Sequence, residues 1–154
     1  MSNKTKKNSI NLNELISFNF YSGWREIEQL FRHIVGTDMT LQKSFILSFL
    51  HDSYRTMKEV SGHLNLDPSA VSTIVDRMFK KELIHRVRDP RDRRVMLVSL
   101  TDEGILLKLK LDEKVKVFSN VLDEGISSED KLVLRRIISQ IQANRIRNSV
   151  SEVE

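Results

Sequence analysis

The sequence of 154 residues contains no cysteine. This absence excludes disulfides, thiolate metal sites, cysteine nucleophiles and thiol-based redox sensing. Only five glycines and two prolines are present, which favours long helices over loop-rich folds. No run of about eighteen apolar residues could span a bilayer, and the polar, lysine-bearing N-terminal segment lacks an apolar signal core. We therefore expect one mainly helical domain, located in the cytoplasm and with no membrane partner.

Sequence signatures of catalysis are also missing. The chain has no HExxH motif, no glycine-rich phosphate loop and no GxSxG elbow. His51-Asp52 is the one dyad that suits metal-dependent phosphohydrolysis, and no second His/Asp motif in the sequence completes such a site. The remaining histidines, His33, His63 and His85, are scattered without the short-range pairing of metal ligands. We expect no enzyme activity, no catalytic residue, no metal and no cofactor.

Positive charge is concentrated in one short segment. The net charge of the chain is +4, and the segment from Arg77 to Arg94 contains eight basic residues against three acidic ones. A local basic patch is typical of nucleic-acid binding, because neutralised phosphates release condensed counterions. The alternative is a solvated charged surface without a ligand.

The arginines of this segment gather in a turn. Asp89-Pro90-Arg91-Asp92-Arg93-Arg94 separates two β-prone runs, Ile84–Arg88 and Val95–Leu100. This pattern predicts a β-hairpin with a charged tip, since Asp-Pro favours a turn. Three arginines within four positions repel one another unless an anion pairs with them. A phosphate backbone is the partner that this arrangement suits best.

A helix-turn-helix is predicted just before the hairpin. Two helical segments, Thr56–Leu64 and Pro68–Ile84, are separated by a short break in which Asp67 can cap the second helix and Pro68 can occupy its first position. Helical spacing places Val71, Ile74, Val75 and Met78 on the inward face. The outward face is small, polar and basic, and comprises Ser69, Ser72, Thr73, Asp76, Arg77 and Lys80. Small hydroxyl side chains allow a helix to approach base edges in the major groove.

Four further helices flank these elements. A first helix over Leu12–Val35 and a buried helix over Leu41–Leu50, capped by Asp38 or Thr40, precede the helix-turn-helix. After the hairpin, Thr101 can cap a helix that runs to Leu122, and a last helix begins at Ser127 or Ser128 with Asp130 in a capping box. The first helix has an apolar seam that requires a partner helix, formed by Ile16, Phe20, Trp24, Ile27, Phe31 and Ile34. The last helix has an apolar stripe of Leu134, Ile137, Ile138, Ile141 and Ile146.

The order of elements and two motifs resemble the MarR family of winged helix-turn-helix transcription regulators. Leu66-Asp67-Pro68-Ser69-Ala70-Val71-Ser72 is similar to the family's entry into its recognition helix. Asp92-Arg93-Arg94, spaced from Leu100-Thr101 and Gly104, is similar to its wing signature. The resemblance implies a mainly α fold with a small β-hairpin wing, and N- and C-terminal dimerisation helices. It covers nearly the whole chain.

The resemblance also implies a function and an organisation. We expect a single domain at 1–154, with dimerisation helices at about 10–36 and 102–148 around a DNA-binding lobe at about 37–101. The protein is expected to be a homodimer that binds double-stranded DNA at a pseudo-palindromic operator, and to act as a repressor. In such proteins the wing arginine at the position of Arg94 enters the minor groove and the acidic residue at Asp92 braces it. The expected DNA contacts are Pro68, Ser69, Ser72, Thr73 and Arg77 in the recognition helix, and Arg91, Asp92, Arg93 and Arg94 in the wing.

Two positions depart from the family pattern. Thr73 stands where many members carry arginine, which puts the pattern of base contacts in doubt. Glu82 stands where the family usually has glycine before the wing. Glycine is the residue that most easily adopts a left-handed helix end.

An effector and a rival function complete the expectations. Many members of the family bind small aromatic or phenolic molecules, and a small aromatic or lipophilic effector is expected to release this regulator. Aromatic residues at helical spacing also suit plain core packing. The candidate pocket comprises Tyr21, Trp24, Arg25, Phe45, Phe49 and Tyr54. The alternative function is a winged-helix protein-association module, whose DNA binding would be weak, sequence-blind and only shallowly dependent on salt.

Overall fold

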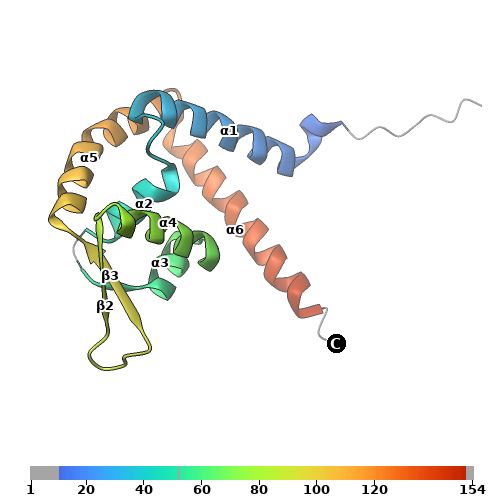
Figure 1. Cartoon of the computed structure of the whole chain (residues 1–154). Coiled ribbons are helices and arrows are strands. Elements are labelled where there is room, and N and C mark those ends of the chain that lie inside the picture. The colour runs from blue at the N-terminus through green and yellow to red at the C-terminus, as the bar shows by residue number, and fades with distance from the viewer. Residues whose placement is uncertain (1–10, 52, 152–154) are drawn as a thin grey trace, which may run out of the picture. The chain divides into compact units, whose positions relative to one another are not determined.

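The computed structural model describes residues 11–51 and 53–151. The predicted start of the first dimerisation helix at residue 10, the polar N-terminal segment and Asp52 of the His51-Asp52 dyad lie outside these residues. The described residues form two compact units, which divide after Phe118. In chain order (Figure 1) the elements are the 3-10 helix η1 (Leu12–Glu14), α1 (Ile16–Val35), α2 (Leu41–Phe49), β1 (Arg55–Thr56), α3 (Met57–Leu64), α4 (Pro68–Lys80), β2 (Ile84–Arg88), β3 (Met96–Leu100), α5 (Asp102–Leu122) and α6 (Ser128–Ser151). The predicted mainly α fold with a β-hairpin wing is confirmed.

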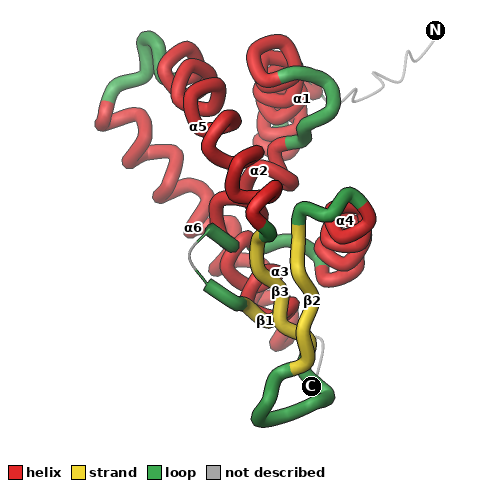
Figure 2. Tube along the Cα trace, turned by 60° about the vertical axis from the view of Figure 1, so that its left-hand side comes forward, coloured by secondary structure: helices red, strands yellow, loops and turns green. Residues whose placement is uncertain are grey.

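The first unit contains a winged helix. Strands β2 and β3 form an antiparallel hairpin in which Ile84 pairs with Leu100 and Arg88 with Met96. Strand β1 pairs with the other edge of β3, so the sheet has the order β1-β3-β2. The hairpin tip projects beyond α3 and α4 (Figures 1 and 2). The sequence predicted the hairpin but not β1, because a strand of two residues has no measurable alternation.

Side-chain caps fix the helix starts. The hydroxyl of Thr40 accepts a hydrogen bond from the Lys43 amide at 3.2 Å and begins α2. Thr56 and Glu59 form a reciprocal capping box at α3, which the sequence interpretation missed. Ser127 and Asp130 form the predicted box at α6. Each cap satisfies backbone donors that the first helical turn leaves unpaired.

Only part of the apolar seam on α1 is covered within the chain. Phe31 is fully buried and packs edge-on against Phe118 of α5, with the ring centroids 5.1 Å apart. Towards the N-terminus of α1 the seam is open, since Ile16 is 60% exposed and Trp24 is 39% exposed. Exposed apolar surface of this kind is typical of a site for another protein chain. The core of the unit also includes the fully buried Ile46, Leu47, Leu50, Val60, Val71, Val75 and Val98.

Helix α4 ends four residues earlier than its predicted limit at Ile84. The chain turns at Lys81 and Glu82, and Ile84 already belongs to β2. The amide of Leu83 donates to the carbonyl of Met78 at 3.0 Å, and the Glu82 amide donates to that of Phe79 at 2.9 Å. This is a Schellman motif, and it places Glu82 in the left-handed region with φ of 58°. The helix therefore stops where the family usually places glycine, although the residue here is glutamate.

Replacement of Glu82 by glycine is expected to stabilise the protein. A left-handed conformation costs a non-glycine residue about 1–2 kcal/mol. Glycine removes this cost, but part of the gain in stability is offset by the greater freedom of glycine in the unfolded chain. We expect a net gain of about 1 kcal/mol, seen as a rise of roughly 2–4 °C in the Tm of thermal unfolding.

Lys80→Gly, inside the same helix end, is the matched control. It should lower the Tm, because glycine costs about 1 kcal/mol in a right-handed helix. A lower Tm for Glu82→Gly would contradict the assignment of strain to Glu82.

The second unit contains the end of α5, a turn and α6. Gly125 has φ of 75° in this turn, and Lys131 forms an ion pair with Asp123 at 2.6 Å. The predicted stripe on α6 remains largely open, with Leu134 48% and Ile146 60% exposed. Among the described residues, no helix is long and apolar enough to cross a membrane.

Candidate nucleic-acid interface

The start of α4 is held by a dense cap. The carboxylate of Asp67 accepts from the amides of Ser69 at 2.8 Å and Ala70 at 3.4 Å, and from the Ser69 hydroxyl. Hydrogen bonds from the Ser69 hydroxyl and amide, and then from Ala70, hold the pKa of Asp67 below its ordinary value. Pro68 occupies the first helical position, as predicted. The exposed helix terminus is therefore rigid at the residues expected to meet DNA.

The exposed face of α4 carries the predicted recognition side chains. Ser69, Ser72, Thr73 and Arg77 are exposed, whereas Val71, Val75 and Met78 are buried. The hydroxyl of Thr73 donates to the carbonyl of Ser69 at 3.0 Å. Since the hydroxyl protons of Ser69 and Thr73 are used within the helix, both side chains offer lone pairs outwards as acceptors.

Asp76 has a different role from its neighbours on α4. Its carboxylate forms an ion pair with the guanidinium of Arg86 on β2. That guanidinium also lies over the ring of Phe79, 4.9 Å from its centroid. The helical pattern predicts Asp76 on the outward face, and no local signal indicates that Arg86, ten residues away, reaches it. This cluster, the Asp76–Phe79–Arg86 clamp, joins the recognition helix to the wing.

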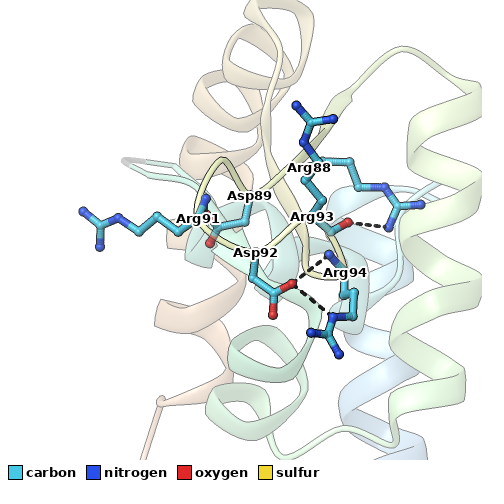
Figure 3. A network of polar contacts seen from close by, with 6 residues as sticks. All are labelled: Arg88, Asp89, Arg91, Asp92, Arg93 and Arg94. Carbon is cyan, nitrogen blue, oxygen red and sulfur yellow. Dashed lines mark hydrogen bonds and ion pairs between the residues drawn. The ribbon is translucent and has the colours of Figure 1, made fainter.

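The wing loop is shaped by two aspartates (Figure 3). The Asp89 carboxylate accepts from the Arg91 amide at 2.8 Å, and the Asp89 amide donates to the Val95 carbonyl at 3.0 Å. The guanidinium of Arg88 donates to the carbonyl of Arg93 at 3.1 Å. These bonds fix the backbone of the loop, while the Arg91 side chain extends away from it.

Asp92 and Arg94 lie in contact. Asp92 Oδ1 accepts from the Arg94 amide at 3.0 Å and lies 3.5 Å from Arg94 Nε (Figure 3). The Arg94 side chain is nevertheless 96% exposed. Within the described ranges, Arg91 and Arg93 form no ion pair, so the positive charge at the tip is only partly balanced. Such a tip attracts an anionic surface.

The base of the wing is tied to α5. The hydroxyl of Thr101 accepts from the Gly104 amide at 3.0 Å, as predicted for a cap, and donates to the Glu82 carbonyl at 2.6 Å. A β-carbon at Gly104 would lie 2.2 Å from the carbonyl oxygen of Leu83. Only glycine fits at this contact, which the sequence pattern did not reveal.

Five of the six candidate effector residues are exposed and one, Phe49, is half-buried. Among them, Tyr21 and Tyr54 are 60% and 52% accessible. Phe49 is instead stacked on His63 with centroids 4.2 Å apart, and the Arg55 guanidinium lies 5.1 Å from the centroid of the same ring. The aromatic effector pocket stays a prediction. Across residues 11–51 and 53–151, no group of three or more metal-ligating side chains is present.

Comparisons with known proteins find similarity over parts of this chain. Residues 40–96 match the model of the MarR family. The HTH-type transcriptional repressor MdtR of Bacillus subtilis is 40% identical over 68 residues, which are 43% of each chain. Over the aligned parts, this chain spans only 43–60% of the length of three curated Bacillus subtilis relatives.

Solved structures agree on the fold. The PcaV regulator of Streptomyces coelicolor, in complex with its natural ligand, aligns with a TM-score of 0.80 at 21% identity, covering 88% of this chain and 96% of PcaV. A mutant MarR of Escherichia coli, complexed with operator DNA, aligns with a TM-score of 0.72 at 20% identity, covering 86% of this chain and 99% of MarR. At these identities the likeness shows a common winged-helix fold.

Proposed function

We propose that this protein, whose residues 40–96 match the model of the MarR family, is a transcriptional regulator that binds double-stranded DNA sequence-specifically in the cytoplasm. The observation that carries the proposal is the joined pair of reading elements. An exposed polar helix face and an arginine-rich hairpin tip are connected by the Asp76–Phe79–Arg86 clamp. In this arrangement α4 enters the major groove and the wing follows the adjacent minor groove.

The contacts divide into two kinds. The short hydroxyl side chains of α4 read base edges, and they belong to Ser69, Ser72 and Thr73. Ser69 and Thr73 accept hydrogen bonds from amino groups of adenine or cytosine. Arg77 pairs with guanine or with a phosphate. Arg94 enters a narrow minor groove, where the negative potential is strongest, and Asp92 holds its orientation. Arg91 and Arg93 bind the backbone.

We infer that the functional unit is a homodimer. The exposed N-terminal half of the α1 seam and the exposed apolar residues of α6 supply surfaces that a second copy would cover. The segments at about 10–36 and 102–148 then act as dimerisation helices around the lobe at about 37–101. Two copies of α4 should be separated by one helical turn of DNA, roughly 34 Å. A monomer in small-angle scattering would contradict this inference.

We further infer repression, by occlusion of a promoter, with release by a small molecule. The relative MdtR is named a repressor and PcaV was solved with its natural ligand. Catalysis has no role in this proposal.

The test is selection of bound sequences from a random duplex library at near-physiological salt. An enriched inverted repeat with half-sites one helical turn apart is expected. Affinity for this site should fall linearly in a plot of log K against log salt, with a slope of about −0.9 per neutralised phosphate. A folded protein that enriches no motif and shows a shallow slope would favour the alternative, a winged-helix protein-association module.

A further inference from the structure

A cavity rich in lysine extends to the C-terminal end of α4, where Lys81 lines it. It is bounded by the end of α1, the following loop, the start of α2 and the middle of α5, and has a volume of about 590 Å³. Binding sites for small molecules have volumes of roughly 300–1,000 Å³. The side chains of Lys43, Lys81, Lys110 and Lys114 line it, and Asp38 is the one acidic residue among its lining.

Positive charge in this cavity is only partly compensated, since four lysines face one aspartate. In the part of the chain that the structure describes, none of the four lysines forms an ion pair with a carboxylate. Lys108, on the same helix, contrasts with them, since it is paired with Asp112 at 2.7 Å and lies outside the cavity. Burial, and then the nearby charge of Lys81, lower the pKa of Lys43, which Asp38 offsets in part. An anion placed here would relieve the repulsion among the lysines.

The cavity also has an apolar floor. Val35, Met39 and Leu111 line it and are each less than 9% exposed. Lys114 is held against this floor, because its ammonium donates to the Val35 carbonyl at the end of α1 at 3.1 Å. A bare inorganic ion would leave this floor unused, whereas a carbon skeleton would cover it.

We propose that this lysine cavity binds a small organic molecule that carries at least two phosphate or carboxylate groups. The anionic groups contact Lys43, Lys81 and Lys110, and the skeleton of the molecule lies on the apolar floor. Site and ligand class both differ from the aromatic pocket predicted around Trp24 and Phe49.

Ligand binding would be coupled to DNA binding through shared lysines. Lys43 and Lys81 also line a neighbouring cavity of about 330 Å³ that reaches Arg77 on the recognition helix. Negative charge at these lysines weakens the positive field beside α4, so the ligand should lower the affinity for DNA. The coupling rests on the proposed function, whereas binding of the anion does not.

The test is isothermal titration calorimetry, in which ADP, pyrophosphate or adenosine is titrated into the full chain in the absence of DNA. ADP is expected to bind more tightly than pyrophosphate, which leaves the apolar floor uncovered, whereas adenosine, which lacks the charges, is not expected to bind. Lys110→Gln and Lys43→Gln should each weaken ADP binding at least about tenfold, since a charge-assisted hydrogen bond is lost. Lys116→Gln is the matched control on α5, because Lys116 is exposed and lies outside the cavity.

Three outcomes would overturn the proposal. These are an absence of binding by both anions at millimolar concentration, an equal loss of ADP binding in Lys116→Gln, and unchanged ADP binding in Lys110→Gln. If Lys110→Gln instead reduced the salt slope of DNA binding while ADP binding was unchanged, the cavity would be a contact for the DNA backbone. Failure of the library selection would leave the titration result intact, so the two proposals fail separately.

Discussion

Arg94→Ala is expected to weaken binding to the selected operator at least about tenfold for each half-site. The Arg94 side chain is almost fully exposed, so its removal leaves no cavity and breaks no internal packing. A loss of affinity would therefore report contact with DNA. The measurement is fluorescence anisotropy of a labelled operator at several salt concentrations, with thermal unfolding to show that stability is unchanged.

The Asp92→Asn variant tests whether Asp92 orients the Arg94 side chain or only adds negative charge to the wing. Asparagine keeps an oxygen that can accept from the Arg94 amide, as Asp92 Oδ1 does at 3.0 Å, but it cannot form the ion pair. The variant also raises the net charge, which by itself strengthens binding to any DNA. If Asp92 braces Arg94, affinity for the operator falls while affinity for unrelated DNA rises. A rise for both would show that Asp92 only repels phosphate.

Gly104→Ala is expected to be the most destabilising single change among those considered. The new β-carbon would lie 2.2 Å from the Leu83 carbonyl oxygen and 3.3 Å from the β-carbon of Leu100. The first of these atoms belongs to the backbone between α4 and β2 and cannot rotate away. We expect a loss of about 3 kcal/mol, seen as a fall of roughly 6–12 °C in Tm at equal protein concentration.

Gly62→Ala is the control for this change. Gly62 is also helical, but nothing lies within 4 Å of the position of its β-carbon. Alanine there should stabilise α3 by about 0.5–1 kcal/mol. Similar behaviour of the two variants would contradict the close contact at Gly104.

Local signals in the sequence were sufficient for most element boundaries. Thr40, Asp67 and Thr101 were predicted to cap helices, and each accepts a hydrogen bond from the first turn. Capping and turn formation depend on residues within three or four positions, so a single sequence contains the information. The hairpin was predicted for the same reason.

Contacts between distant residues were not predictable in this way. The packing of Phe31 on Phe118 and the approach of Gly104 to Leu83 depend on how the elements pack, which no local pattern encodes. The predicted end of α4 was wrong because the backbone at Glu82 is left-handed. Glycine, the residue that usually indicates this conformation in a sequence, is absent at this position. At the candidate site, the exposed side chains of α4 agree with its predicted outward face. The clamp and the lysine cavity could be recognised only from the structure.

The Asp76–Phe79–Arg86 clamp has a consequence for changing the specificity of this protein. A recognition helix transplanted from a relative that lacks Asp76 and Phe79 would leave Arg86 on β2 with its side chain half-buried and without these partners. The graft would then lose its fixed angle to the hairpin even if every base-reading residue were correct. A functional transplant therefore has to keep Asp76 and Phe79 or move β2 together with the helix, so that the two DNA-reading elements are exchanged as one module.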